Sequence, residues 1–73
     1  MITITLAVKN FSPVVRNAED WADAGPILDE LIYQQYDMLG RIPEAALVRN
    51  SSGRVLDVYD VQISGGTCQK VKR

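Results

Sequence analysis

The sequence predicts a two-layer α+β domain with elements in the order β-α-β-β, in which one main helix packs on one face of a three-stranded sheet. Residues 2–8 alternate between large apolar and smaller side chains, as a half-buried strand does. Residues 21–39 place apolar side chains at helical spacing, and two further apolar segments flank a Ser-Ser-Gly stretch. A chain of 73 residues has room for one such domain, so we expect residues 1–73 to form it.

The composition restricts how this domain is stabilised. Hydrophobic residues make up 47% of the chain, as in ordinary globular proteins. There is no histidine, which excludes His-based zinc sites and catalytic triads, and the single cysteine, Cys68, excludes an internal disulfide. Because a domain of this size buries only about 60% of its unfolded surface, a partner chain is the stabilising device left open.

No segment predicts membrane insertion or export. The longest apolar runs are far shorter than a membrane-spanning helix. The first ten residues lack the basic region and the cleavage site of a signal peptide, and a single cysteine fits a reducing compartment. We therefore expect a cytoplasmic protein without a membrane partner.

The first element, ITITLAV at residues 2–8, is predicted to be a half-buried strand because its β-branched residues recur at period two. Residues 9–17 contain Pro13 and are expected to form a loop, in which Phe11, Val14 and Val15 tuck under the domain. Pairing of the first strand is left open between parallel and antiparallel. The side chains expected to face the helix are Ile2, Ile4, Leu6 and Val8.

The second element is a helix with a predicted interruption. Asn17 is expected to cap a short turn that runs through Trp21. Gly25 and Pro26 are expected to break this turn and restart the helix, and Gly40 is expected to end it. The stripe predicted to face the core contains Trp21, Ala24, Leu28, Leu31, Ile32, Gln35 and Leu39.

The last two elements are predicted to form a β-hairpin. Residues 51–53 form its loop, with Gly53 in a left-handed conformation. This loop fixes which side chains share a face of the two strands, 44–50 and 54–63. The pairs predicted to face the helix are Val48 with Leu56 and Ala46 with Val58.

The opposite face of this hairpin is predicted to be a partly apolar surface. A contiguous exposed apolar patch usually marks an interface, so this face is a candidate docking surface or homodimer seam. The alternative is that residues 11–15 or the C-terminal tail cover it. The residues assigned to this face are Ala45, Leu47, Arg49, Val55, Asp57, Tyr59, Val61 and Ile63.

Charge is divided unevenly along the chain. Residues 1–40 hold two basic and six acidic residues, whereas residues 41–73 hold six basic and three acidic residues. The helix is therefore expected to present either a solvated acidic face or a contact surface for a basic partner. Residues 66–73 are expected to be a frayed basic tail. The acidic face contains Asp29, Glu30 and Asp37, flanked by Tyr33 and Tyr36.

No motif predicts catalysis or cofactor binding. The carboxylates do not follow the spacing of a calcium loop, and no histidine stands near Cys68 to activate its thiol. The basic tail is short and has no aromatic residue for base stacking, which argues against a nucleic-acid partner. We expect no catalytic, cofactor-binding or metal-binding residues, and no cofactor.

One short segment resembles a known family. The stretch DWADAGPILDE, residues 20–30, is similar to a segment of the phage ABA-sandwich family, which occurs in temperate phages and prophages. The resemblance implies a small phage-type accessory protein and does not extend to the fold. Such proteins commonly bind and block a host machine, including CRISPR surveillance complexes. The matching residues are Asp20, Trp21, Ala22, Gly25, Pro26, Ile27, Leu28 and Asp29.

These observations favour a non-enzymatic protein–protein interaction module. We expect a phage-encoded, anti-CRISPR-like inhibitor that covers the surface of a host or defence protein, in the cytoplasm of the host. The alternatives left open are a homodimeric structural or assembly protein and a small DNA-binding transcriptional regulator. The expected partner-binding residues are Asp29, Glu30, Tyr33, Tyr36, Asp37, Leu47, Val55, Tyr59 and Val61.

Overall fold

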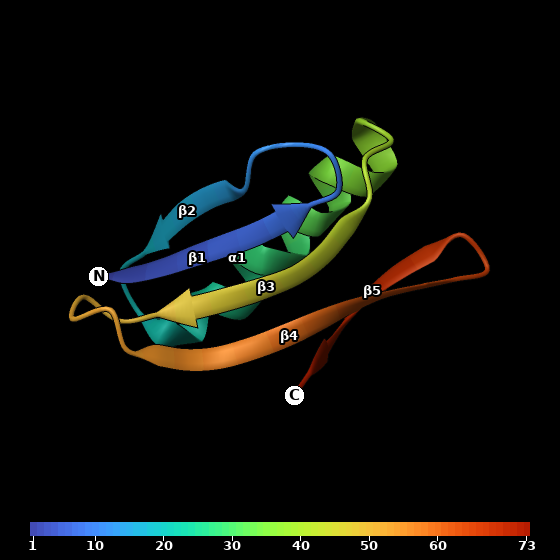
Figure 1. Cartoon of the computed structure of the whole chain (residues 1–73). Coiled ribbons are helices and arrows are strands. Elements are labelled where there is room, and N and C mark those ends of the chain that lie inside the picture. The colour runs from blue at the N-terminus through green and yellow to red at the C-terminus, as the bar shows by residue number, and fades with distance from the viewer.

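A computed structural model describes residues 1–73 and shows one helical layer on one face of a five-stranded sheet (Figure 1). The strands lie in the order β2-β1-β3-β4-β5, and every neighbouring pair is antiparallel. None of the helices combines the length and the apolar character that a membrane span requires. The elements are β1 (Ile2–Val8), β2 (Val14–Ala18), α1 (Trp21–Tyr33), the π-helical η1 (Gln34–Met38), β3 (Pro43–Arg49), β4 (Val55–Ser64) and β5 (Thr67–Lys72).

The prediction of a three-stranded sheet is wrong, because two further strands extend it at its edges. β2 lies in the segment predicted to be a loop, and pairs with β1 from Val14 to Ala18. β5 lies in the segment predicted to be a frayed tail, and pairs with β4 along its whole length. Gly65 and Gly66, at φ +57° and +79°, form the tight turn that joins β4 to β5.

The helical segment is continuous where a break was predicted. α1 begins at Trp21, with Asp20 rather than Asn17 at the N-cap position, and Pro26 lies inside it. η1 continues α1 in wider π-helical turns. Gly40, at φ +66°, ends the helical segment as predicted.

The hydrophobic core lies between α1 and the central strands β1 and β3. The prediction for β1 is confirmed, because its four alternate apolar side chains are buried. Four apolar residues expected to be covered are instead about half exposed, namely Phe11, Val15, Trp21 and Leu39. The buried residues of the helical segment and of β3 are Ala24, Leu28, Leu31, Ile32, Gln35, Pro43, Ala46 and Val48.

The predicted register of the β3–β4 hairpin is correct only near its loop. Arg49 pairs with Val55 as predicted. The register then shifts, so that the neighbouring residue of β3, Val48, pairs with Asp57 rather than with Leu56. Leu56 is therefore an extra residue in β4, and every later residue of this strand lies on the opposite face from the one predicted. Tyr59 and Val61 consequently pack against the core on the helix side, rather than on the opposite face.

Candidate functional site

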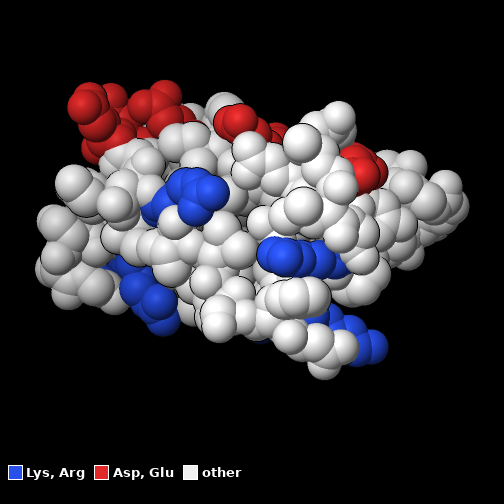
Figure 2. Space-filling model, turned by 90° about the horizontal axis from the view of Figure 1, so that it is seen from above, with Lys and Arg blue, Asp and Glu red and all other residues white.

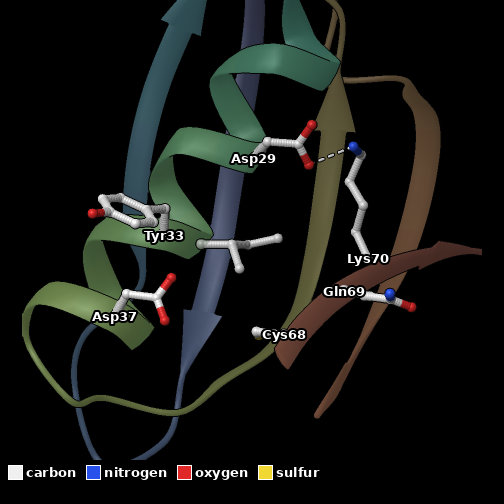
Figure 3. Close-up of a pocket in the computed structure, with 7 residues that line it drawn as sticks. Asp29, Tyr33, Asp37, Cys68, Gln69 and Lys70 are labelled. Atoms are coloured by element: carbon white, nitrogen blue, oxygen red, sulfur yellow. Dashed lines mark hydrogen bonds and ion pairs between the residues drawn. The ribbon is translucent and has the colours of Figure 1, made fainter. Parts of the chain in front are cut away.

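A groove lies between the helical layer and β5 (Figure 3). The helix covers the β2, β1 and β3 side of the sheet, and the β4–β5 hairpin extends beyond it (Figure 1). The space between them has a volume of about 440 Å³. We call it the helix–β5 groove; its lining residues are Asp29, Ile32, Tyr33, Asp37, Cys68, Gln69 and Lys70.

The helical wall of the groove combines three residues that the sequence singled out. Asp29, Tyr33 and Asp37 are spaced four positions apart, which places them along one side of the helical segment. All three side chains are exposed, and the Tyr33 side chain is more than half exposed at 56%. In Figure 3, Asp29 points across the groove and Asp37 lies toward its other end. The wall therefore offers two carboxylates and a phenol on a rigid element.

The β5 wall supplies a cation that reaches the helical wall. Lys70 Nζ lies 2.5 Å from Asp29 Oδ1, and the carboxylate of this pair is largely exposed. An ion pair with one partner in solvent adds little to stability. It does show that an amino group fits beside Asp29, while Asp37 has no basic partner.

The remaining polar group of the groove is the Cys68 thiol. Partial burial raises the pKa of this thiol, and the negative charge of Asp37 raises it further. The thiol is therefore protonated at neutral pH, and a protonated thiol is a weak nucleophile. No group of three or more histidine, cysteine or acidic side chains is arranged to hold a metal ion.

The other acidic and aromatic residues of the helix lie off the groove. Glu30 is exposed on the flank that faces β2, where Gln34 Nε2 donates to its carboxylate at 3.4 Å. Tyr36 is only partly exposed. The predicted acidic face is thus divided, with Asp29, Tyr33 and Asp37 on the groove side and Glu30 on the other.

The four sheet residues that were predicted to bind a partner do not share one surface. Leu47 and Val55 lie on the face opposite the helix, whereas Tyr59 and Val61 pack against the helix-side core. The change of register in β4 causes this separation. The residues selected from the sequence therefore occupy two faces with the thickness of the sheet between them.

Sequence reasoning missed a buried polar cluster at the start of α1. The Asp57 side chain is only 5% exposed, and its carboxylate accepts a hydrogen bond from Trp21 Nε1 at 2.7 Å. Lys72 Nζ lies 2.8 Å from the other carboxylate oxygen and 5.9 Å from the centroid of the Trp21 ring. The hydrogen bond from Lys72 is the main reason why the pKa of Asp57 is lowered. The sequence signal that could have indicated this cluster is an aspartate that stands between apolar residues in a predicted strand.

The positive charges of the C-terminal segment are largely paired. Lys70 contacts Asp29, Lys72 contacts Asp57, and Arg73 contacts Asp60 at 2.6 Å. Acidic side chains gather along one margin of the molecule in Figure 2, and the basic side chains visible there lie apart from them. The helical layer therefore keeps most of its negative charge exposed.

No protein-family model, no curated protein and no solved structure matches the chain. The geometry and charge of the chain are therefore the basis for a functional proposal.

Proposed function

We propose that the chain is a protein-binding module that acts by covering a basic surface of its target with the groove side of the α1–η1 segment. The single observation on which this proposal rests is the row formed by Asp29, Tyr33 and Asp37. The row is exposed, it borders the helix–β5 groove, and it stands on a helix that packs tightly on the sheet.

The exposed tyrosine favours a protein as the partner. Tyrosine is enriched among residues that dominate binding energy, because its ring contributes a large contact area and its hydroxyl group still forms hydrogen bonds. Tyr33 is exposed between two carboxylates, so a basic side chain of a partner could contact the ring and one carboxylate together. Carboxylates around such a contact also accelerate encounter with a basic surface.

The charge distribution disfavours a nucleic acid as the partner. The cations that the sequence offered for phosphate binding, Lys70, Lys72 and Arg73, each contact a carboxylate of the same chain. Phosphate binding would have to compete with these pairs, and the acidic helical layer would repel the phosphate backbone. A basic protein surface, including one that normally binds nucleic acid, has the complementary charge.

The phage-type resemblance of residues 20–30 supports a host or anti-phage defence protein as the target. An inhibitor that blocks a surface needs no catalytic group, and it needs a rigid face with complementary charge and shape. We therefore extend the proposal to inhibition by surface blocking, in the manner of an anti-CRISPR protein.

Site-specific photo-crosslinking tests the proposal. A benzophenone amino acid replaces Tyr33 in one variant and Gln62, which is exposed on β4, in the control variant. We expect a discrete crosslinked protein in a bacterial host lysate from the Tyr33 variant only, and we expect its yield to fall as salt rises.

Substitutions of the carboxylates then test the role of charge. Asp37→Asn combined with Asp29→Asn should weaken binding of the identified target by at least about tenfold, which corresponds to about 1.4 kcal/mol. Glu44→Gln, an exposed acid outside this row, is the matched control and should bind like the original chain. Unchanged binding by the double variant, with an unchanged circular dichroism spectrum, would contradict the proposal.

A further inference from the structure

We infer that the free edge of β2 binds an extended segment of another protein, which adds to the sheet as a further strand beside the flank of α1. This inference concerns a different surface from the proposed function and does not depend on it. β2 lies at the edge of the sheet, so it pairs with β1 on one side only (Figure 1). The backbone groups on its other side are a template for another strand.

The hydrogen bonds of β1 show which of its residues bond to β2. In an antiparallel sheet the N–H and C=O of one residue point to the same side of the strand, and successive residues alternate between the two sides. The Lys9 N–H donates to the Ile42 carbonyl on the β3 side. The Val8 carbonyl accepts from the Phe11 N–H, which lies in the connection to β2. The residues of β1 that bond to β2 are therefore Ile2, Ile4 and Leu6.

The same alternation identifies the free backbone groups of β2. The partners of those three residues in β2 are Ala18, Arg16 and Val14. The two residues between them, Val15 and Asn17, therefore direct their N–H and C=O groups away from β1. The Val15 carbonyl accepts a hydrogen bond from Arg16 Nη1 at 3.0 Å. Arg16 is exposed and forms no ion pair within the chain, so an incoming strand can displace its guanidinium from this carbonyl.

The flank of α1 gives an added strand a second surface to contact. A groove of about 220 Å³ lies between β2 and the helical layer; its lining residues are Arg16, Asn17, Ile27, Glu30, Leu31 and Gln34. Ile27 packs against the core and is still partly exposed. Alternate side chains of the added strand would face this groove, as Val14 and Arg16 do in β2. The β5 edge lacks such a surface, because the β4–β5 hairpin extends beyond the helix (Figure 1).

The charges of the two sheet edges favour another protein over a second copy of this chain. β2 carries Arg16, β5 carries two lysines, and neither strand contains an acidic residue. Neither edge of a second copy therefore offers a carboxylate to Arg16. An acidic side chain directly opposite Arg16 would form a favourable cross-strand pair. We expect an extended segment with an acidic residue opposite Arg16 and apolar residues on either side of it that face Ile27.

A five-residue peptide with blocked ends, Val-Thr-Glu-Thr-Val, tests the inference. In an antiparallel register its glutamate stands opposite Arg16, its valines face the helix, and its threonines pair with Val15 and Asn17. In an NMR titration up to about 5 mM peptide, we expect saturable shifts of the Val15 and Asn17 amides, with a dissociation constant of about 1 mM. The amides of β5 should not shift.

The matched control is the same peptide with N-methylated threonines. It keeps every side chain but cannot donate backbone hydrogen bonds to β2, so it should not bind. Equal binding of the methylated peptide would overturn the inference. The absence of saturable shifts in β2 with the unmodified peptide would overturn it as well.

A charge exchange tests the register. Arg16→Glu should weaken binding of Val-Thr-Glu-Thr-Val about fivefold, because two carboxylates then face each other across the strands. Val-Thr-Lys-Thr-Val should bind the variant more tightly than the original chain, and this gain requires a folded protein. Glu30 is present in both proteins, so its charge cancels in the comparison. The same peptide preference in both proteins would contradict the inference.

Discussion

The indole N–H of Trp21, the first residue of α1, donates a 2.7 Å hydrogen bond to the carboxylate of Asp57 on β4. This bond joins the start of the helix to a strand whose apolar side chains are only partly buried or exposed. Lys72 on β5 contacts the same carboxylate at 2.8 Å. One buried acid therefore links the helical layer to both β4 and β5, and the extra residue in β4 directs it toward the helix.

Removing the Asp57 carboxylate should destabilise the fold. Asp57→Ala loses both polar contacts and leaves the indole N–H unsatisfied, so we expect the free energy of unfolding to fall by about 2–3 kcal/mol. Asp57→Asn keeps an oxygen that accepts from Trp21 and loses only the ion pair, so its effect should be about 1 kcal/mol. Urea unfolding followed by circular dichroism measures both. The matched control is Asp60→Ala, which removes an exposed ion pair and should have a much smaller effect. If Asp57→Ala and Asp60→Ala lowered the free energy of unfolding equally, the contacts of Asp57 would not act together.

The same carboxylate should make stability fall in acid. The hydrogen bond from Lys72 is the largest cause that lowers the pKa of Asp57 below its ordinary value of 3.8. A lowered pKa in the folded state means that the unfolded chain binds a proton first, so the contribution of Asp57 is present above about pH 4. It is lost progressively as the pH falls from about 4 through the pKa of the folded state. Unfolding free energies from pH 7 to pH 2 should therefore decrease less for Asp57→Asn than for the original chain. Parallel curves for the two proteins would contradict this assignment.

The elements whose side chains follow a single hydrophobic pattern could be predicted from the sequence. The alternation of β1 and the helical spacing of Leu28, Leu31 and Ile32 each reflect burial against one layer, and both predictions were correct. The edge strands could not be recognised in the same way, because neither face of an edge strand is fully buried. β2 has one buried residue and β5 has none, so the hydrophobic pattern that marks a strand is weak in both.

The register of β4 could not be predicted for a different reason. Apolar side chains occupy both faces of this strand, so the pattern does not say which face turns toward the helix. The irregularity after Val55 decides it, and it is stabilised by tertiary contacts of Asp57 that are distant in sequence. The helix–β5 groove could likewise be predicted only in part. The helical spacing placed Asp29, Tyr33 and Asp37 on one wall, but Cys68 and Gln69 could not be placed on the other wall because β5 was not recognised.

Hydrogen exchange should distinguish strand β5 from a frayed tail. The Arg73 backbone N–H donates to the Val58 carbonyl at 2.9 Å, and the preceding residues pair with β4 as far as Lys72. We therefore expect slow exchange at the Arg73 amide, although it is the last residue of the sequence. The Gly65 and Gly66 amides of the turn should exchange faster and serve as the internal comparison. Uniformly fast exchange across residues 67–73 would contradict the fifth strand.

The reactivity of Cys68 should report the electrostatics of the helix–β5 groove. Burial, and secondarily the charge of Asp37, raise the pKa of this thiol above its ordinary value of 9.0. Only the thiolate reacts with iodoacetamide, so alkylation at pH 8 should be slower than that of cysteine in an unstructured peptide. Asp37→Asn removes the negative charge, lowers the pKa of the thiol and should accelerate alkylation, with the midpoint of the pH–rate profile moved to lower pH. Glu30→Gln changes an acid on the other flank of the helix and should leave the profile unchanged. If both variants accelerated the reaction equally, the effect would come from the net charge of the chain rather than from the position of Asp37 beside the thiol.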